Sequence, residues 1–291
     1  MELASERWRV SMASKADAGR VTALLRQARW THYHADWHLP GDWLGFPGFV
    51  LARAADGDAL AGCLCVAPDP LPAAWVRLAA VNDPAGGLEI MGEMMAAALD
   101  AARKSEVAEV ALLGRDTYLD RWLPALGFSV VNEVVTYLKY DLDGGSAPPD
   151  ANPDLTVRDV RLDDLARLVE IEAAAFSPIW RHSLESLALG WQHAVNFHVA
   201  ELEERVVGFQ YSTRSDRTAA AHLVRLTVNP AAQRRGVGSA LLAAALDSYR
   251  QMGYDTVSLN TQADNEASQR LYERFGFQPA GYALPVWHVP L

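Results

Sequence analysis

A glycine-bearing segment in the second half of the chain has residue types that can bind an anion. Residues 233–238 read QRRGVG, after the strand-like AHLVRLTV and before a run with helical apolar spacing. A helix that starts after such a turn has unpaired backbone N–H groups, and its dipole favours negative charge. Gly236 and Gly238 lack the Cβ that would obstruct a phosphate. The segment therefore suits a pyrophosphate, with Arg234 and Arg235 adding charge at its rim.

A second group of polar residues follows in a segment expected to be a helix. After the strand-like TVSLN, residues 265–277 read NEASQRLYERFGF. Asn265, or the preceding aspartate, is a suitable N-cap, and Gly276 suits the left-handed C-terminal cap. The expected core stripe is Ala267, Leu271 and Phe275. Ser268 and Tyr272 lie one turn apart on the adjacent face, where a tyrosine can point beside the core rather than into it.

Both segments are expected to lie on a unit that occurs twice in the chain. The segment that starts at Val81 aligns without gaps with the one that starts at Val228, an offset of 147 residues. WLPALGF, which ends at Phe128, aligns with LYERFGF, which ends at Phe277, at an offset of 149 residues. We therefore expect an α+β fold of two tandem domains, each a mixed, mostly antiparallel sheet flanked by helices.

The boundary between the two repeats is expected in a stretch that favours neither helix nor strand. Residues 143–154 read DGGSAPPDANPD, rich in glycine, proline and aspartate. We therefore expect one domain at 1–142, a linker at 143–154 and a second domain at 155–291.

The strand, the QRRGVG turn with its helix, the second strand and the NEASQRLYERFGF helix together resemble the GNAT superfamily of acyl-CoA-dependent N-acyltransferases. The close match runs from about Leu223 to Phe277. The resemblance implies acetyl-CoA as cosubstrate, with its pyrophosphate on the glycine turn and its pantetheine arm paired with the main chain of Leu226 and Val228. It also implies that Tyr272 faces the sulfur. The implied cofactor-binding residues are Leu226, Thr227, Val228, Gln233, Arg234, Arg235, Gly236, Val237, Gly238, Ser239, Asn265 and Ser268.

Amide formation needs a neutral amine to attack the thioester and a proton for the departing thiolate. Tyr272 is the expected general acid, although it could instead only pack against the cofactor. The base is less clear, because relatives often have a glutamate where this chain has Val224. His222 lies two residues earlier, on the same strand face by alternation, and has a suitable unperturbed pKa. Glu170, Glu172 and an ordered-water relay remain rivals.

The acceptor amine is expected to contact the segment from Phe176 to His193, because in this family the region after the first helix borders the acceptor site. Its large aromatic residues, Phe176, Trp180 and Trp191, could each also be plain core. The sequence therefore does not name the acceptor.

The first repeat is expected to be a damaged copy that lacks catalysis. Glu89 and Met91 align with Gly236 and Gly238, where they would fill the phosphate site, and the glutamate would repel the pyrophosphate. Leu123 aligns with Tyr272. The aromatic stretch from Trp30 to Trp43 contains a His34/His38 pair, but no third ligand is evident, so we expect packing or pocket lining and no metal site.

Composition excludes several other classes of function. The net charge of −10 and the pI of about 5.3 disfavour a nucleic-acid or anionic-membrane partner. Cys63 and Cys65 are the only cysteines and are expected to be buried strand residues, too far apart for a disulfide. With no apolar signal core near the start, a cytoplasmic location is expected.

The sequence favours an enzyme that acetylates a primary amine of a small molecule, acting as a monomer or homodimer. A peptide or protein N-terminus is a less favoured acceptor. A more specific alternative is mycothiol synthase, which is similarly a tandem GNAT protein with a degenerate half. From a different class, the chain could be a non-catalytic acyl-CoA sensor or interaction module; the intact Gly236, Gly238 and Tyr272 favour the enzyme.

Overall fold

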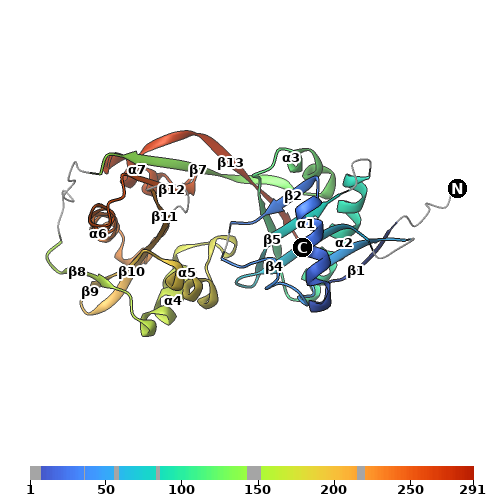
Figure 1. Cartoon of the computed structure of the whole chain (residues 1–291). Coiled ribbons are helices and arrows are strands. Elements are labelled where there is room, and N and C mark those ends of the chain that lie inside the picture. Colours follow the sequence, from blue (N-terminus) through green and yellow to red (C-terminus); the bar gives the residue numbers. More distant parts are fainter. Residues whose placement is uncertain (1–7, 36, 56–58, 83–85, 143–151, 215–219) are drawn as a thin grey trace. The chain divides into compact units, whose positions relative to one another are not determined.

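The chain forms two compact units in a computed structural model that describes residues 8–35, 37–55, 59–82, 86–142, 152–214 and 220–291 (Figure 1). Unit 1 comprises Met1–Val131 and Pro285–Leu291, and unit 2 comprises Asn132–Leu284. None of the helices in these described ranges is both long and apolar enough to cross a membrane.

Unit 1 is a mixed sheet with helices on both faces. Its elements are β1 (Trp8–Met12), α1 (Ala18–Gln27), β2 (Trp30–Tyr33), β3 (Phe49–Ala54), β4 (Leu60–Pro68), β5 (Ala73–Val81), α2 (Gly87–Lys104), β6 (Glu109–Leu113), α3 (Leu119–Trp122), the start of β7 (Ser129–Tyr140) and the end of β13 (Gln278–Pro290). The main strand order is β1-β3-β4-β5-β6-β13, and β2 pairs with β5. Strands β5 and β6 pair in parallel, whereas β1 with β3, β3 with β4, β4 with β5, β2 with β5 and β6 with β13 pair antiparallel. The methionine-rich apolar stripe of α2 packs on one face of the sheet and α1 on the other.

Unit 2 repeats this plan. Its elements are β8 (Leu155–Asp159), α4 (Leu165–Ala175), α5 (Leu184–His193), β9 (Asn196–Leu202), β10 (Arg205–Arg214), β11 (Ala220–Val228), α6 (Val237–Gln251), β12 (Thr256–Gln262), α7 (Glu266–Arg274) and the remaining parts of β7 and β13. Its strand order is β7-β12-β11-β10-β9-β8, with β11 and β12 parallel and the other pairs antiparallel. The expected apolar face of α6, formed by Leu241, Leu242, Ala245 and Tyr249, is fully buried.

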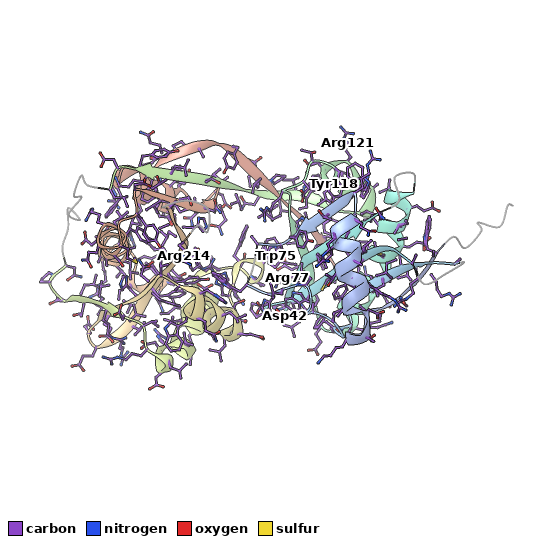
Figure 2. All side chains as sticks on the ribbon, viewed as in Figure 1. Asp42, Trp75, Arg77, Tyr118, Arg121 and Arg214 are labelled. Atoms are coloured by element: carbon purple, nitrogen blue, oxygen red, sulfur yellow. The ribbon has the colours of Figure 1, made fainter. Side chains whose placement is uncertain are left out.

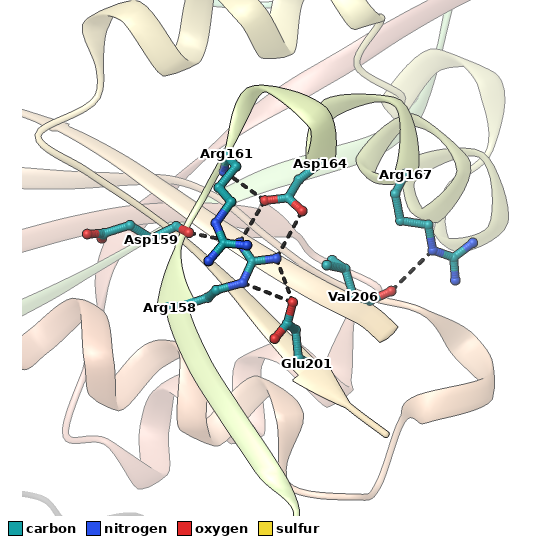
Figure 3. Close-up of polar contacts among 7 residues, drawn as sticks. All are labelled: Arg158, Asp159, Arg161, Asp164, Arg167, Glu201 and Val206. Carbon is teal, nitrogen blue, oxygen red and sulfur yellow. Dashed lines mark hydrogen bonds and ion pairs between the residues drawn. The ribbon is translucent and has the colours of Figure 1, made fainter. Parts of the chain in front are cut away.

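The N-terminus of α4 is fixed to the sheet of unit 2 by two arginines. Arg158 of β8 donates to Asp164, just before α4, and to Glu201 of β9 (Figure 3). Hydrogen bonds from Arg158 lower the pKa of Asp164. Arg167, in the first turn of α4, donates from Nε to the carbonyl of Val206 at 3.1 Å (Figure 3). These bonds hold the start of α4 to the sheet, and the helix packs on β10 and β11.

The internal repeat extends to details of backbone geometry, and the predicted fold class is confirmed. At the offset of 147 residues, β1 starts where β8 starts and α1 starts where α4 starts. A β-bulge also recurs, with Arg77 as the extra residue on β5 and Val224 on β11. A bulge adds an unpaired residue and increases the local twist.

Two long strands make the units differ from the expected domains. Residues 134–140 of β7 pair with β12 and belong to unit 2, whereas residues 286–290 of β13 pair with β6 and belong to unit 1. The domain expected at 1–142 therefore lacks most of β7, which belongs to unit 2. The domain expected at 155–291 lacks the end of β13, which belongs to unit 1. Linker residues 143–151 lie outside the described residues, and composition near a linker does not show which strand a neighbouring segment pairs with.

Cys63 and Cys65 lie on β4, as expected, and both are fully buried. Both belong to the apolar cluster that also contains α1. Neither of these described residues forms a disulfide, so they serve as small core residues.

Candidate active site

The strands β11 and β12 diverge beside the motif segments. They pair in parallel only from Ala220 to Leu223, opposite Thr256–Leu259. Beyond the bulge at Val224, β11 continues beside β10 alone, and the end of β12 pairs with β7. Among the described residues, no strand pairs with the edge of β11 from Arg225 to Val228 on the β12 side. This segment, which we call the open edge, ends a few residues before the QRRGVG turn.

Hydrogen-bond alternation shows which groups face outward from the open edge. Asn229 N donates to Val207 O at 2.8 Å, so this is a bonded pair of the antiparallel ladder between β11 and β10. Bonded pairs alternate with non-bonded pairs, so Thr227 also bonds to β10. The backbone N–H and C=O groups of Leu226 and Val228 then point away from β10. These are the two residues whose main chain was expected to pair with a pantetheine arm.

Helix α6, which follows the turn after the open edge, has no side-chain N-cap among the described residues. Gly236 is the N-cap of α6 at φ +82°, a region that strains residues with a Cβ. No described side chain caps α6, so the N–H groups of Val237, Gly238 and Ser239 have no partner within the helix. Val237 is itself buried in the core and holds this turn against the sheet. The turn thus presents unpaired donors at the positive end of the helix dipole.

Two neighbouring arginines differ in their contacts. Arg235 pairs with Glu203 at 3.1 Å, and its carbonyl accepts from Asn152. Arg234 is exposed, has a positive φ of 61° and forms no ion pair with another described residue. Gln233, also exposed, ends the preceding turn by donating its N–H to Pro230. Arg234 is therefore the better placed of the two arginines to meet an external anion.

The structure gives a second reason for a glycine at residue 238, besides the expected close approach of a phosphate. A Cβ at this position would lie 3.3 Å from Leu271 of α7 and 3.7 and 3.8 Å from Val228 and Leu226 of the open edge. A side chain here would therefore crowd the Leu271 side chain of α7. The absence of a Cβ lets the two motif helices meet beside the open edge.

Tyr272 lies in the core of unit 2, which differs from the expectation that it points beside the core. It is 5% exposed, and its ring lies 6.2 Å from the ring of Tyr137 and 5.9 Å from that of Phe277. Burial raises the pKa of Tyr272 to about 12, against the opposing effects of the Arg225 charge and a hydrogen bond with Ser268. Tyr272 therefore keeps its proton throughout the neutral pH range.

The first turn of α7 is fixed as predicted, with one exception. Asn265 is the N-cap, and its side-chain oxygen accepts from Ser268 N at 3.2 Å. This leaves the amide nitrogen of Asn265 for any contact with a ligand. Leu271 and Phe275 are buried, but Ala267 is exposed because it lies in the first turn, before α7 reaches the sheet.

His222 lies on the opposite face of the sheet from Tyr272. Ala221 and Leu223 pack in the same cluster as Tyr272, so His222 between them points to the α4 side. Its Nδ1 lies 2.8 Å from Ser258 Oγ of β12, and burial lowers the pKa of His222. The bulge at Val224 interrupts the alternation, and Arg225, which bonds to Glu172 of α4, shares the face of His222.

Glu172, a rival candidate for the base, is held by an ion pair. The fully buried carboxylate accepts from Arg225 Nε at 3.0 Å and from Arg225 Nη2, and also from Thr227 Oγ1 at 2.7 Å and His182 N at 3.0 Å. Burial alone would raise the pKa of Glu172, but the charges of Arg225 and His182 and the hydrogen bonds hold it below its usual value. A carboxylate with four donors is a poor proton acceptor. Glu170, the other glutamate, is exposed and pairs with Arg167.

The expected acceptor segment contacts this ion pair. Arg225 lies 3.9 Å above the ring of Phe176, and its Nη2 donates to the carbonyl of Trp180 at 2.6 Å. Trp180 ends a 3-10 turn, η4 (Pro178–Trp180), whereas Trp191 on α5 is 38% exposed. The α4–α5 segment therefore borders β11 on the face of His222 and Arg225.

Unit 1 lacks the corresponding turn. Helix α2 starts at Gly87, whereas the residue aligned with the first residue of α6 is Ile90. One extra helical turn thus occupies the positions of the QRRGVG turn, with Glu89 inside it. Leu123, aligned with Tyr272, is fully buried in the core.

Sequence reasoning missed two residues that shape this region. Tyr137 of β7 donates to Gln269 at 3.3 Å and Glu273 at 3.2 Å on α7, besides packing on Tyr272. Arg225 was read only as part of a strand. No signal in the sequence marks Tyr137, because it lies in the first repeat; an arginine within an otherwise apolar strand was a signal for a buried partner.

Comparison with known proteins agrees with this geometry. The model of the acetyltransferase (GNAT) family matches residues 165–277, a range that contains the open edge, the turn, α6 and α7. Residues 165–277 belong to the GNAT family. The resemblance seen in the sequence is thereby confirmed.

The GNAT relatives include mycothiol acetyltransferases. The one from Brachybacterium faecium is 31% identical over 178 residues, which cover 55% of this chain and 53% of that protein. The one from Acidimicrobium ferrooxidans is 32% identical over 168 residues, 53% of this chain and 54% of that protein. The chain thus spans about half the length of these curated relatives.

Solved structures extend the GNAT fold to both units. A tandem GNAT protein from the clavulanic acid biosynthesis pathway has a TM-score of 0.62 at 16% identity, covering 97% of this chain and 98% of that chain. At this identity the likeness shows the fold alone. It confirms the tandem architecture expected from the repeat.

Proposed function

We propose that unit 2 binds acetyl-CoA and transfers its acetyl group to a primary amine of a small molecule. The observation that carries this proposal is the open edge of β11, which leads into the uncapped N-terminus of α6. The edge offers the backbone of Leu226 and Val228 to a pantetheine arm, as an added strand would use it. The α6 N-terminus offers N–H groups to the pyrophosphate.

The acceptor amine enters from the α4–α5 side in this proposal. Phe176 and Trp180 border β11 there, and Arg225 connects both to the sheet. The thioester lies where β11 and β12 diverge, so the amine meets it from the face of His222, and Tyr272 approaches from the other face. A ternary complex of this kind requires no covalent enzyme intermediate.

The chemical step then needs two proton transfers. The amine nitrogen attacks the thioester carbonyl carbon, a C–N bond forms, and the C–S bond breaks. Tyr272, protonated at neutral pH, donates to the departing thiolate. His222, whose pKa is lowered by burial, is neutral at that pH and takes the proton lost by the amine.

The His222→Gln protein should lose the acid limb of the pH profile. As a base, His222 works only when neutral, so wild-type kcat/KM, calculated on the concentration of neutral amine, should fall as the pH drops through the pKa of His222, which burial holds below 6.5, and stay level above it. Glutamine can still hydrogen-bond Ser258 but cannot take the proton, and a loss of about 10²-fold is expected. We would measure kcat/KM from pH 5 to 9 for both proteins. A limb that survives in the variant would assign the proton to water.

The proposed activity is tested directly with acetyl-CoA and a panel of primary amines. Release of free CoA that depends on the amine is the expected result, with one acetyl-CoA bound per chain in calorimetry. The mycothiol acetyltransferase relatives make the unacetylated amine precursor of mycothiol a necessary member of the panel. A peptide with a free N-terminus tests the less favoured acceptor class. Tight acetyl-CoA binding without turnover on any amine would instead favour a sensor.

A further inference from the structure

The two units have the same strand geometry at the edge that unit 2 leaves open. In unit 1, β5 and β6 pair in parallel only over Ala73–Trp75, and the bulge at Arg77 follows. At the offset of 147 residues this pairing aligns with the first part of the pairing between β11 and β12. The segment Leu78–Val81 aligns with Arg225–Val228. Unit 1 therefore has an edge that corresponds to the open edge.

In unit 1 this edge is occupied by the chain itself. Strand β2 lies beside β5 (Figure 1). The two strands pair antiparallel, with His32 opposite Ala79 and Trp30 opposite Val81. His34 N donates to Arg77 O at 2.9 Å, so by alternation His32 and Trp30 also form bonded pairs with β5.

Strand β2 bonds to the two residues of β5 that align with the proposed pantetheine-binding residues of the open edge. Asn82 N donates to Ala61 O at 2.9 Å, as the aligned Asn229 does to Val207, so the backbone groups of Ala79 and Val81 point away from β4. Ala79 and Val81 align with Leu226 and Val228. Strand β2 thus satisfies the backbone groups that unit 2 leaves for the pantetheine arm.

Aromatic side chains cover the adjoining helix N-terminus. The ring of Trp30 lies 5.1 Å from that of Tyr118, which Figure 2 labels, and 5.8 Å from that of Trp122. A Cβ added to Gly87, the first residue of α2, would lie 2.8 Å from Trp122. Apolar rings therefore pack at the helix end that would otherwise face an anion.

Residue differences explain why unit 2 lacks such a strand. The segment aligned with β2 is 177–180, and Pro178 stands where Thr31 stands in unit 1. Pro178 begins the 3-10 turn η4, and the carbonyl of Trp180 in this turn accepts from Arg225. Arg225 aligns with Leu78, which has no such donor. In unit 2 the segment is therefore bound to the face of β11 and not to its edge.

We infer that β2 is a built-in peptide ligand that takes the place of the pantetheine arm in unit 1 and keeps that unit free of acyl-CoA. The inference rests on the proposed function for the position of the arm in unit 2. It adds a second cause for the lack of acyl-CoA binding in unit 1, independent of the glycines that unit 1 lacks in this turn. Even with glycines at residues 89 and 91, the backbone groups of Ala79 and Val81 would already be bonded.

Hydrogen exchange of the full chain with and without acetyl-CoA tests the inference. Peptides that contain residues 225–228 should exchange at least about tenfold more slowly with acetyl-CoA present, because an open edge gains partners. Peptides that contain residues 78–81 should be protected already and should not change. If acetyl-CoA slows exchange at both segments, the inference is overturned and the proposed function stands. If it changes neither, the proposed function fails.

A matched pair of proline variants tests the role of β2 without any ligand. His32→Pro removes an N–H that bonds to β5, whereas Thr31→Pro removes one that points away from β5. Exchange at residues 78–81 should rise at least about tenfold in His32→Pro and stay near the wild-type rate in Thr31→Pro. Equal rates in the two variants would contradict the pairing. If His32→Pro does not fold, the exchange of the wild-type chain with and without acetyl-CoA still tests the inference.

Discussion

The Gly236→Val protein should bind acetyl-CoA at least about 10²-fold more weakly than the wild type. Gly236 has a φ of +82°, and a β-branched residue held there is strained by about 1–3 kcal/mol. The turn relieves this strain by moving, which displaces the N–H groups of Val237, Gly238 and Ser239 from the pyrophosphate. Losing about 2.7 kcal/mol of binding corresponds to the 10²-fold change. Isothermal titration calorimetry with acetyl-CoA measures it.

Gly253 provides a matched control on the same helix. It has a φ of +77° just after α6, and a Cβ there would contact nothing within 4 Å. Gly253→Val therefore introduces the same strain at the opposite end of α6. Acetyl-CoA affinity should be near wild type in this control, with both variants folded by circular dichroism. Equal losses in the two variants would show that strain in α6, and not the position of the turn, controls binding.

The Tyr272→Phe protein should show a kcat at least about tenfold lower, with acetyl-CoA affinity almost unchanged. The substitution keeps the ring between Tyr137 and Phe277 and removes only the hydroxyl. An acid with a pKa of about 12 is weaker than a thiol, so the transfer of its proton to the thiolate is uphill, and the expected loss lies at the lower end of the range for general acids. Steady-state kinetics and calorimetry separate the two effects.

Tyr249→Phe is the control for removing a buried hydroxyl. Tyr249 on α6 is fully buried and hydrogen-bonds Ser212, away from the open edge. Loss of the Tyr249 hydroxyl should lower the free energy of unfolding without lowering kcat. If Tyr272→Phe weakens acetyl-CoA binding and leaves kcat unchanged, the hydroxyl serves binding. If neither quantity changes, water returns the proton to the sulfur.

The sequence predicted the parts of the fold that depend on local patterns. The strand, turn and helix at 221–251 follow from β-branched runs, glycines and apolar spacing, which depend on nearby residues. The N-cap at Asn265 and the left-handed Gly276 follow for the same reason. The repeat also predicted the tandem architecture, because two copies of one pattern fold alike.

The sequence could not predict features that depend on partners far along the chain. The β-bulge at Val224 changes which residues share a face, so His222 and Arg225 could not be placed together from alternation alone. The pairing of β7 with β12 joins residues more than a hundred positions apart. Burial of Tyr272 has the same origin, since one of its neighbours, Tyr137, comes from the first repeat.

Strand β7 also bears on the history of the chain. After a duplication, a copy that loses its ligand site is usually free to be deleted. Here a C-terminal half encoded alone would lack the strand beside β12, the hydrogen bond from Thr136 to Asn260, and Tyr137 against the helix of Tyr272. The first copy would then be kept by selection on folding, whatever became of its own chemistry.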